Sequence, residues 1–105
     1  MPSVASKESG EELVKVLSNV TVKNSMGLHA RPASIIAQML KDVSCSVTFL
    51  LGEERANAKS IMGILMLAAG CGSTIAIEAE GPDAQEVIDR LVLMFDNEFE
   101  ELVNG

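Results

Sequence analysis

The only histidine of the chain, His29, lies in the stretch NSMGLHARPAS, residues 24–34. A neutral imidazole is a competent nucleophile, because one ring nitrogen can attack while the other stays available for a hydrogen bond. Arg31 follows two residues later, and its planar guanidinium suits phosphate oxygens. Pro32 fits a helix only in its first turn, so a helix must begin close to His29. Since a helix start presents unpaired N–H groups and positive partial charge, the stretch favours an anion site.

Position alone also allows a plainer role for His29, as a polar surface side chain or a helix-start side chain tied to nearby backbone. A metal site is disfavoured because His, Cys and carboxylate ligands do not cluster in the sequence. A catalytic triad is disfavoured because no nucleophile-elbow or oxyanion-hole motif is present. The helix start, Arg31 and the imidazole together make His29 a plausible carrier of a transferable phosphoryl group, which must be exposed to meet two proteins in turn.

A second stretch, KSIMGILMLAAGCG, residues 59–72, predicts a short helix. Ser60 is a good N-cap candidate, and Gly70 and Gly72 are expected to end the segment. Its apolar residues exceed what one face of a short helix can bury. We assign to the core Ile64, Leu65 and Leu67. Ile61 and Met62 should then remain exposed near His29 as an apolar docking surface.

The elements that position these residues follow from periodicity. Alternating residues predict strands over 16–22, 45–51 and 73–81, and a returning strand over 54–58 after a tight turn at Gly52-Glu53. Three- and four-residue spacing predicts helices over 30–41 and 83–102, the latter capped by Asp83. The stripe of the first helix comprises Ala33, Ile36, Ala37 and Leu40, with Ile35 and Met39 beside it. This βαββαβα order favours an α+β open-faced two-layer sandwich, in which three helices cover one face of a four-stranded antiparallel sheet.

Composition narrows the class of protein. The 105 residues suffice for one domain, and no apolar stretch approaches the roughly 20 residues of a membrane span. The net charge is −7, residues 78–105 carry nine acidic groups against Arg90, and aromatic residues are few, which together disfavour nucleic acid as a partner. Two cysteines without CxxC spacing and an N-terminus without a signal-peptide pattern favour the cytoplasm. The polar residues 1–14 are expected to form a flexible N-terminal extension to a domain over 15–105.

GLHARPA, residues 27–33, closely resembles the phosphohistidine signature of HPr, the histidine-containing phosphocarrier family of the bacterial sugar phosphotransferase system. KSIMG, residues 59–63, resembles the second signature of that family, and the resemblance runs over residues 16–102. It implies that His29 accepts a phosphoryl group from phosphoenolpyruvate via Enzyme I on Nδ1 and passes it to Enzyme IIA domains. Arg31 would balance the phosphate charge, and the Ala30 and Arg31 N–H groups would form part of the cradle. The protein would be a monomer that needs no cofactor and turns over no substrate alone.

The resemblance also implies regulation through Ser60, which an HPr kinase/phosphorylase would phosphorylate, and a transcriptional regulator as a further partner. Ala33, Ile61 and Met62 are expected to contact Enzyme I and Enzyme IIA. Two alternatives stay open: a mainly regulatory binding protein that acts through phospho-Ser60, and a carrier of a nitrogen-related phosphotransferase branch. The chain departs from the family in its extra residues 1–14, and in having Ala68 and Cys71 where members often carry glycine and lysine.

Overall fold

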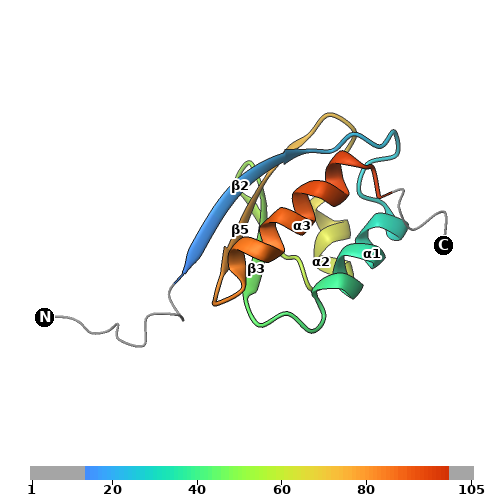
Figure 1. Ribbon diagram of the computed structural model, residues 1–105. Coiled ribbons are helices and arrows are strands. Elements are labelled where there is room, and N and C mark those ends of the chain that lie inside the picture. Colours follow the sequence, from blue (N-terminus) through green and yellow to red (C-terminus); the bar gives the residue numbers. More distant parts are fainter. Residues whose placement is uncertain (1–13, 100–105) are drawn as a thin grey trace, which may run out of the picture.

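The computed structural model describes residues 14–99, which form a four-stranded sheet and three helices (Figure 1). The elements in chain order are β2 (Lys15–Thr21), α1 (Ala30–Leu40), β3 (Ser46–Leu51), β4 (Glu54–Asn57), α2 (Ile61–Leu67), β5 (Thr74–Glu80) and α3 (Ala84–Asp96). Apart from Val14, the predicted N-terminal extension lies outside the described residues.

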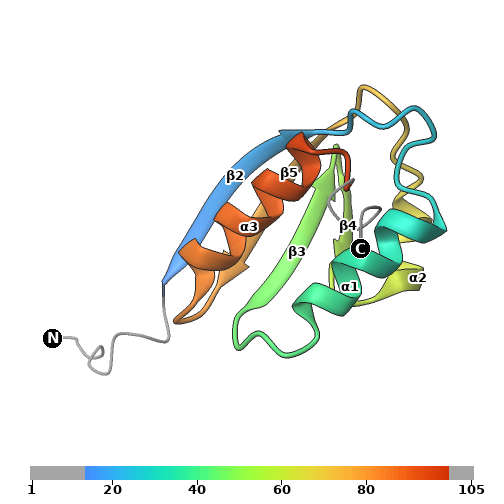
Figure 2. The same cartoon turned by 45° about the vertical axis from the view of Figure 1, so that its right-hand side comes forward.

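The sheet is antiparallel throughout, in the order β2-β5-β3-β4. All three helices lie on one side of it: α3 crosses β2 and β5, while α1 and α2 lie together toward the β3–β4 side (Figure 2). Strand alternation explains this arrangement, because Ile75, Ile77 and Ala79 of β5 are buried beneath the helices while the intervening residues face away. The predicted open-faced α+β sandwich is confirmed.

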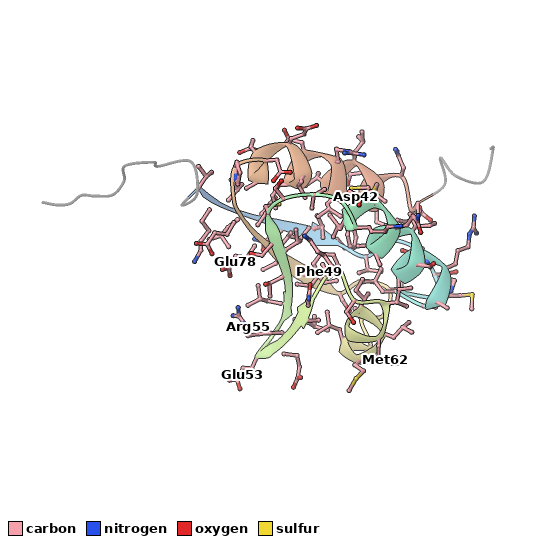
Figure 3. The ribbon with its side chains drawn as sticks, turned by 90° about the horizontal axis from the view of Figure 1, so that it is seen from below. Asp42, Phe49, Glu53, Arg55, Met62 and Glu78 are labelled. Atoms are coloured by element: carbon pink, nitrogen blue, oxygen red, sulfur yellow. The ribbon has the colours of Figure 1, made fainter. Side chains whose placement is uncertain are left out.

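The core lies between the sheet and the helices, with Phe49 of β3 at its centre (Figure 3). The Phe49 ring packs edge-to-face on Phe95 of α3, with ring centroids 6.0 Å apart. Helix α1 buries the predicted stripe, and Pro32 lies within its first turn. The hairpin turn is also confirmed, since Gly52, with φ +60°, and Glu53 connect β3 to β4.

Two helix ends differ from the sequence prediction. Helix α2 ends at Leu67, before both glycines, because Ala68 adopts the left-handed conformation (φ 54°) and its N–H donates to Leu65. Helix α3 ends at Asp96 rather than at 102. There the N–H of Phe99 donates to the Met94 carbonyl and that of Glu98 to the Phe95 carbonyl, a Schellman closure that places the Phe99 ring on Phe95. Residues 100–102 of the predicted helix lie outside the described residues.

The predicted capping role of Asp83 is wrong. Its carboxylate makes no capping bond to α3 and instead accepts hydrogen bonds from the backbone N–H groups of Ser44 (3.1 Å) and Cys45 (3.0 Å). The bond from Ser44 is the main cause that lowers the pKa of Asp83. Asp83 therefore fastens the start of α3 to the residues before β3, a tertiary contact that local sequence does not encode.

Candidate functional site

His29 is the N-cap residue of α1, with extended backbone (φ −84°, ψ −167°). Its side chain is half-buried and makes no capping hydrogen bond, so the imidazole is not used to close its own helix. Its carbonyl accepts the N–H of Ala33 at 3.1 Å, the first bond of the helix. The sequence prediction of a helix start at His29 is confirmed.

The N-terminal end of α1 has few free backbone N–H donors, and the sequence determines which residues supply them. Pro32 has no N–H, and the Ala33 N–H is bound to His29, so Ala30 and Arg31 are the first-turn residues whose N–H groups lack an intrahelical acceptor. The first turn contains no acidic residue, and the Arg31 side chain is exposed. Positive helix-end charge and two N–H groups without an intrahelical acceptor thus belong to the residues that directly follow His29, and Arg31 adds a guanidinium to the same turn, a combination suited to a phosphate group.

The loop before His29 rests against the end of α2. The N–H of Leu28 donates to the Ala69 carbonyl at 2.9 Å, and Leu28 itself is buried. Gly27 (φ +71°) lies so close to this turn that a Cβ there would fall against the Ala69 carbonyl oxygen and 2.8 Å from Gly70 Cα. The turn that follows α2 therefore supports the loop before His29.

Ser60 is the N-cap of α2, as predicted. Its Oγ accepts the N–H of Gly63 at 3.0 Å, and the side chain is half-buried. The preceding Lys59 donates from Nζ to the Val43 carbonyl at 2.9 Å, which fixes the entry to the helix. Ser60 lies at the opposite end of α2 from the turn that contacts the His29 loop.

Helix α2 exposes an apolar surface, which we call the α2 patch: Ile61, Met62 and Met66, with exposed fractions of 43%, 65% and 77%. Met62 points away from the body of the protein (Figure 3). The predicted exposure of Ile61 and Met62 is confirmed. Met66 was not assigned to this surface from sequence, although its spacing of four residues from Met62 places both on one helix face.

Ala33 does not belong to this surface. It is completely buried in the core, so the expectation that it contacts a partner is wrong. The reason is the helix period, which puts Ala33 on the same inward stripe as Ile36, Ala37 and Leu40. Next to Ile61, a groove of about 400 Å³ between α1 and α2 brings Lys41 and Lys59 together and gives the edge of the α2 patch a positive charge.

Other site types find no support among residues 14–99. No group of three or more His, Cys, Asp or Glu side chains there could hold a metal ion. Nor do these residues contain a helix long and apolar enough to cross a membrane. Cys45 is buried, and burial, with a hydrogen bond to Asp83, raises the pKa of its thiol to about 11. A protonated thiol in the core is structural rather than nucleophilic.

Comparisons with known proteins agree with this site. The family model described as "PTS HPr component phosphorylation site" matches residues 16–97. The chain is 41% identical to the phosphocarrier protein HPr of Treponema pallidum over 82% of this chain and 98% of that protein. It is 36% identical to the phosphocarrier protein NPr of Shewanella violacea over 85% and 98% of the two chains. The crystal structure of HPr-C-His from Thermoanaerobacter tengcongensis superposes with a TM-score of 0.77 at 36% identity, covering 80% of this chain and 94% of that one.

The fold and these matches define the class of bacterial phosphocarrier proteins. Within that class, the chain belongs to the HPr family of the phosphotransferase system.

Proposed function

We propose that this protein carries a phosphoryl group on His29 between Enzyme I and Enzyme IIA domains in the cytoplasm, for sugar uptake. The lone pair of the neutral imidazole Nδ1 attacks phosphorus, the bond between phosphorus and the donor breaks, and the donor keeps that electron pair. Phosphoenolpyruvate is the source of the group through Enzyme I. The protein turns over no substrate alone and needs no cofactor. The carrier domain spans residues 15–105, with residues 1–14 as an extension.

The observation that carries this proposal is the mouth of α1. Ala30 and Arg31, whose N–H groups lack an intrahelical acceptor, directly follow the N-cap His29, whose side chain makes no capping bond, and Arg31 also carries an exposed guanidinium. After transfer these donors would offset the charge of the phosphate, which a helix N-terminus and a planar guanidinium both favour. The labile P–N bond keeps the group transferable, so the same residue can receive it from one protein and give it to the next.

Labelling tests the carrier role directly. Incubation with Enzyme I and radiolabelled phosphoenolpyruvate should give an acid-labile label, and His29→Ala should abolish it. Ser60→Ala is the matched control, because it changes the other phosphorylation site and should label normally. Unchanged labelling of the His29→Ala protein would exclude His29 as the carrier.

Ser60 is proposed as a regulatory phosphorylation site for an HPr kinase/phosphorylase. A phosphate there adds close to two negative charges beside the α2 patch, and its oxygens can still accept the Gly63 N–H that the hydroxyl accepts now. Kinase and ATP should therefore label the wild type and His29→Ala but not Ser60→Ala. Phospho-Ser60 protein should bind Enzyme I more weakly, and equal binding of the two forms would refute regulation through docking.

Enzyme I and Enzyme IIA are proposed to dock on the α2 patch, with a transcriptional regulator as a further partner of the phospho-Ser60 form. Exposed Met side chains adapt to several partner shapes, which suits a carrier with more than one partner. The basic groove edge at Lys41 and Lys59 would favour acidic partner surfaces. The protein is proposed to be a monomer, which light scattering across a dilution series tests.

The match to NPr of Shewanella violacea favours a second candidate, a carrier of the nitrogen-related phosphotransferase branch. Purified Enzyme I proteins of the two branches separate the candidates, because the correct one should phosphorylate His29 at a much lower enzyme concentration. A third role, mainly regulatory binding through phospho-Ser60, predicts that sugar uptake survives deletion of the protein while a transcriptional response is lost.

A further inference from the structure

The loop that leads into His29 is closed by one side chain, that of Asn24. Residues 24–27 form a turn in which the Gly27 N–H donates to the Asn24 carbonyl at 3.0 Å. The side-chain Nδ2 of Asn24 then donates to the Gly27 carbonyl at 2.6 Å. Both backbone polar groups of Gly27, two residues before His29, are therefore held by the same asparagine.

Together with two further bonds, Asn24 fixes the backbone on both sides of the imidazole. Leu28 N–H is bound to the Ala69 carbonyl, and the His29 carbonyl accepts the Ala33 N–H. The three residues Gly27, Leu28 and His29 thus contribute four polar backbone groups to hydrogen bonds. Among these groups, only the Gly27 carbonyl depends on a side chain, so it is the one that a single substitution can release.

The Asn24 side chain contributes little to the free energy of folding. Its Oδ1 is buried and, among the described residues, receives no hydrogen bond. The amide cannot be turned over to satisfy it, because Oδ1 would then face the Gly27 carbonyl oxygen at the short distance now occupied by Nδ2. The penalty of a buried unpaired acceptor is about as large as the net gain from one hydrogen bond. Asn24 therefore adds order to the loop at little or no net gain in folding free energy, and a buried polar group left unsatisfied in this way calls for a functional explanation.

Resting on the proposed carrier function, we propose that Asn24 is a positioning residue, which holds the Gly27–Leu28 backbone so that His29 is presented to the phosphoryl donor in one orientation. The side chain acts through the loop and does not touch the transferred group. Its loss allows the loop to leave the Ala69 carbonyl, and His29 then samples orientations that cannot attack in line. Docking on the α2 patch involves other residues and is unaffected.

The test uses two variants of the full chain, Asn24→Ala, which removes the amide, and Asn24→Asp, which keeps the shape but cannot donate to the Gly27 carbonyl. For both we expect kcat for phosphorylation by Enzyme I to fall about fivefold with KM unchanged. The melting temperature of Asn24→Ala should move by less than about 4 °C, whereas that of Asn24→Asp should fall further, because a carboxylate oxygen then faces the Gly27 carbonyl oxygen. The matched control is Asn19→Ala, on the exposed side of β2, for which neither kinetic constant should change. An unchanged kcat in both Asn24 variants overturns the proposal.

Hydrogen exchange of two amides supplies a readout that does not need phosphorylation. The Leu28 amide, bound to Ala69, should exchange about tenfold faster in the Asn24 variants. The Val22 amide joins the same two loops through its bond to the Ser73 carbonyl (2.8 Å) and should keep its rate. Equal acceleration at both amides, or none at Leu28, overturns the proposal. If the wild type is not phosphorylated by Enzyme I, the carrier function fails, and the exchange rates still decide whether Asn24 holds the loop.

Discussion

Two glycines with similar backbone conformations allow the contact between the His29 loop and α2 to be weighed. Gly27 has φ +71° and Gly52 has φ +60°, so an alanine at either position incurs the left-handed cost of about 1–2 kcal/mol. Because alanine gives the unfolded chain less conformational entropy than glycine does, about 0.4–1 kcal/mol of this cost is offset. The Cβ at Gly52 would have nothing within 4 Å, whereas that at Gly27 would collide with the backbone of Ala69 and Gly70.

Gly52→Ala should accordingly lower the free energy of unfolding by about 0.5–1 kcal/mol. Gly27→Ala adds overpacking against rigid backbone, about 1–3 kcal/mol, for a total of about 1.5–4 kcal/mol. Relief of the collision would move the loop away from α2 and break the Leu28–Ala69 bond, so Gly27→Ala should also slow phosphorylation of His29 by Enzyme I. Gly52→Ala should leave that rate unchanged.

The assay is urea unfolding followed by circular dichroism, with phosphorylation measured on the same preparations. The difference between the two variants isolates the close approach, since the conformational cost is shared. Equal destabilisation by Gly27→Ala and Gly52→Ala would refute the inference that the His29 loop is packed on the Ala69–Gly70 backbone.

Three further outcomes are expected. Ala68→Gly should raise the free energy of unfolding by about 0.5–1 kcal/mol in urea unfolding, because an exposed left-handed alanine is replaced by a residue without that strain. The Cys45 thiol should make the free energy of unfolding fall as pH rises from about 9 to about 11, by at most about 1.4 kcal/mol per pH unit, because the unfolded chain releases the Cys45 proton before the folded protein does. Thiolate absorbance of a Cys71→Ser variant, in which Cys45 is the single thiol, checks the assignment. Met62→Ala should leave the melting temperature nearly unchanged and weaken Enzyme I binding by calorimetry, since Met62 is 65% exposed.

Sequence periodicity predicted the parts of the fold that local physics determines. The inward stripe of α1, the alternation of β5 and the positive φ of Gly52 each depend on residues close together in the chain, and each is confirmed. Part of the candidate site could be predicted for the same reason, because it depends on neighbouring residues. Pro32 can occupy only the first turn of a helix, and this constraint placed His29 at the N-cap before any contact was known.

Some features that the sequence did not predict have a different cause. The Asp83 carboxylate binds the backbone N–H groups of Ser44 and Cys45 instead of capping α3, and these two groups come within its reach only after folding. Helix α2 ends at Leu67 because Ala68 adopts the left-handed conformation, which alanine disfavours, so no glycine marks the end. The role of Asn24 could not be predicted from the sequence, because its side chain closes a turn that contacts the residues after α2 only in the folded protein. Tertiary contacts therefore decided the roles of Asp83 and Asn24, whereas the end of α2 is a local backbone conformation.

Helix α2 bears on both proposed phosphorylation sites of this small domain. Ser60 caps its start, while the turn that follows its last residue contacts the loop before His29, and the seven residues of the helix separate its two ends by about 10 Å. The α2 patch begins directly at Ser60, with Ile61 and Met62 as its first members. Phosphorylation of Ser60 should therefore weaken docking and raise KM, whereas changes at Asn24 should lower kcat, because Ser60 adjoins the α2 patch and Asn24 holds the turn before His29.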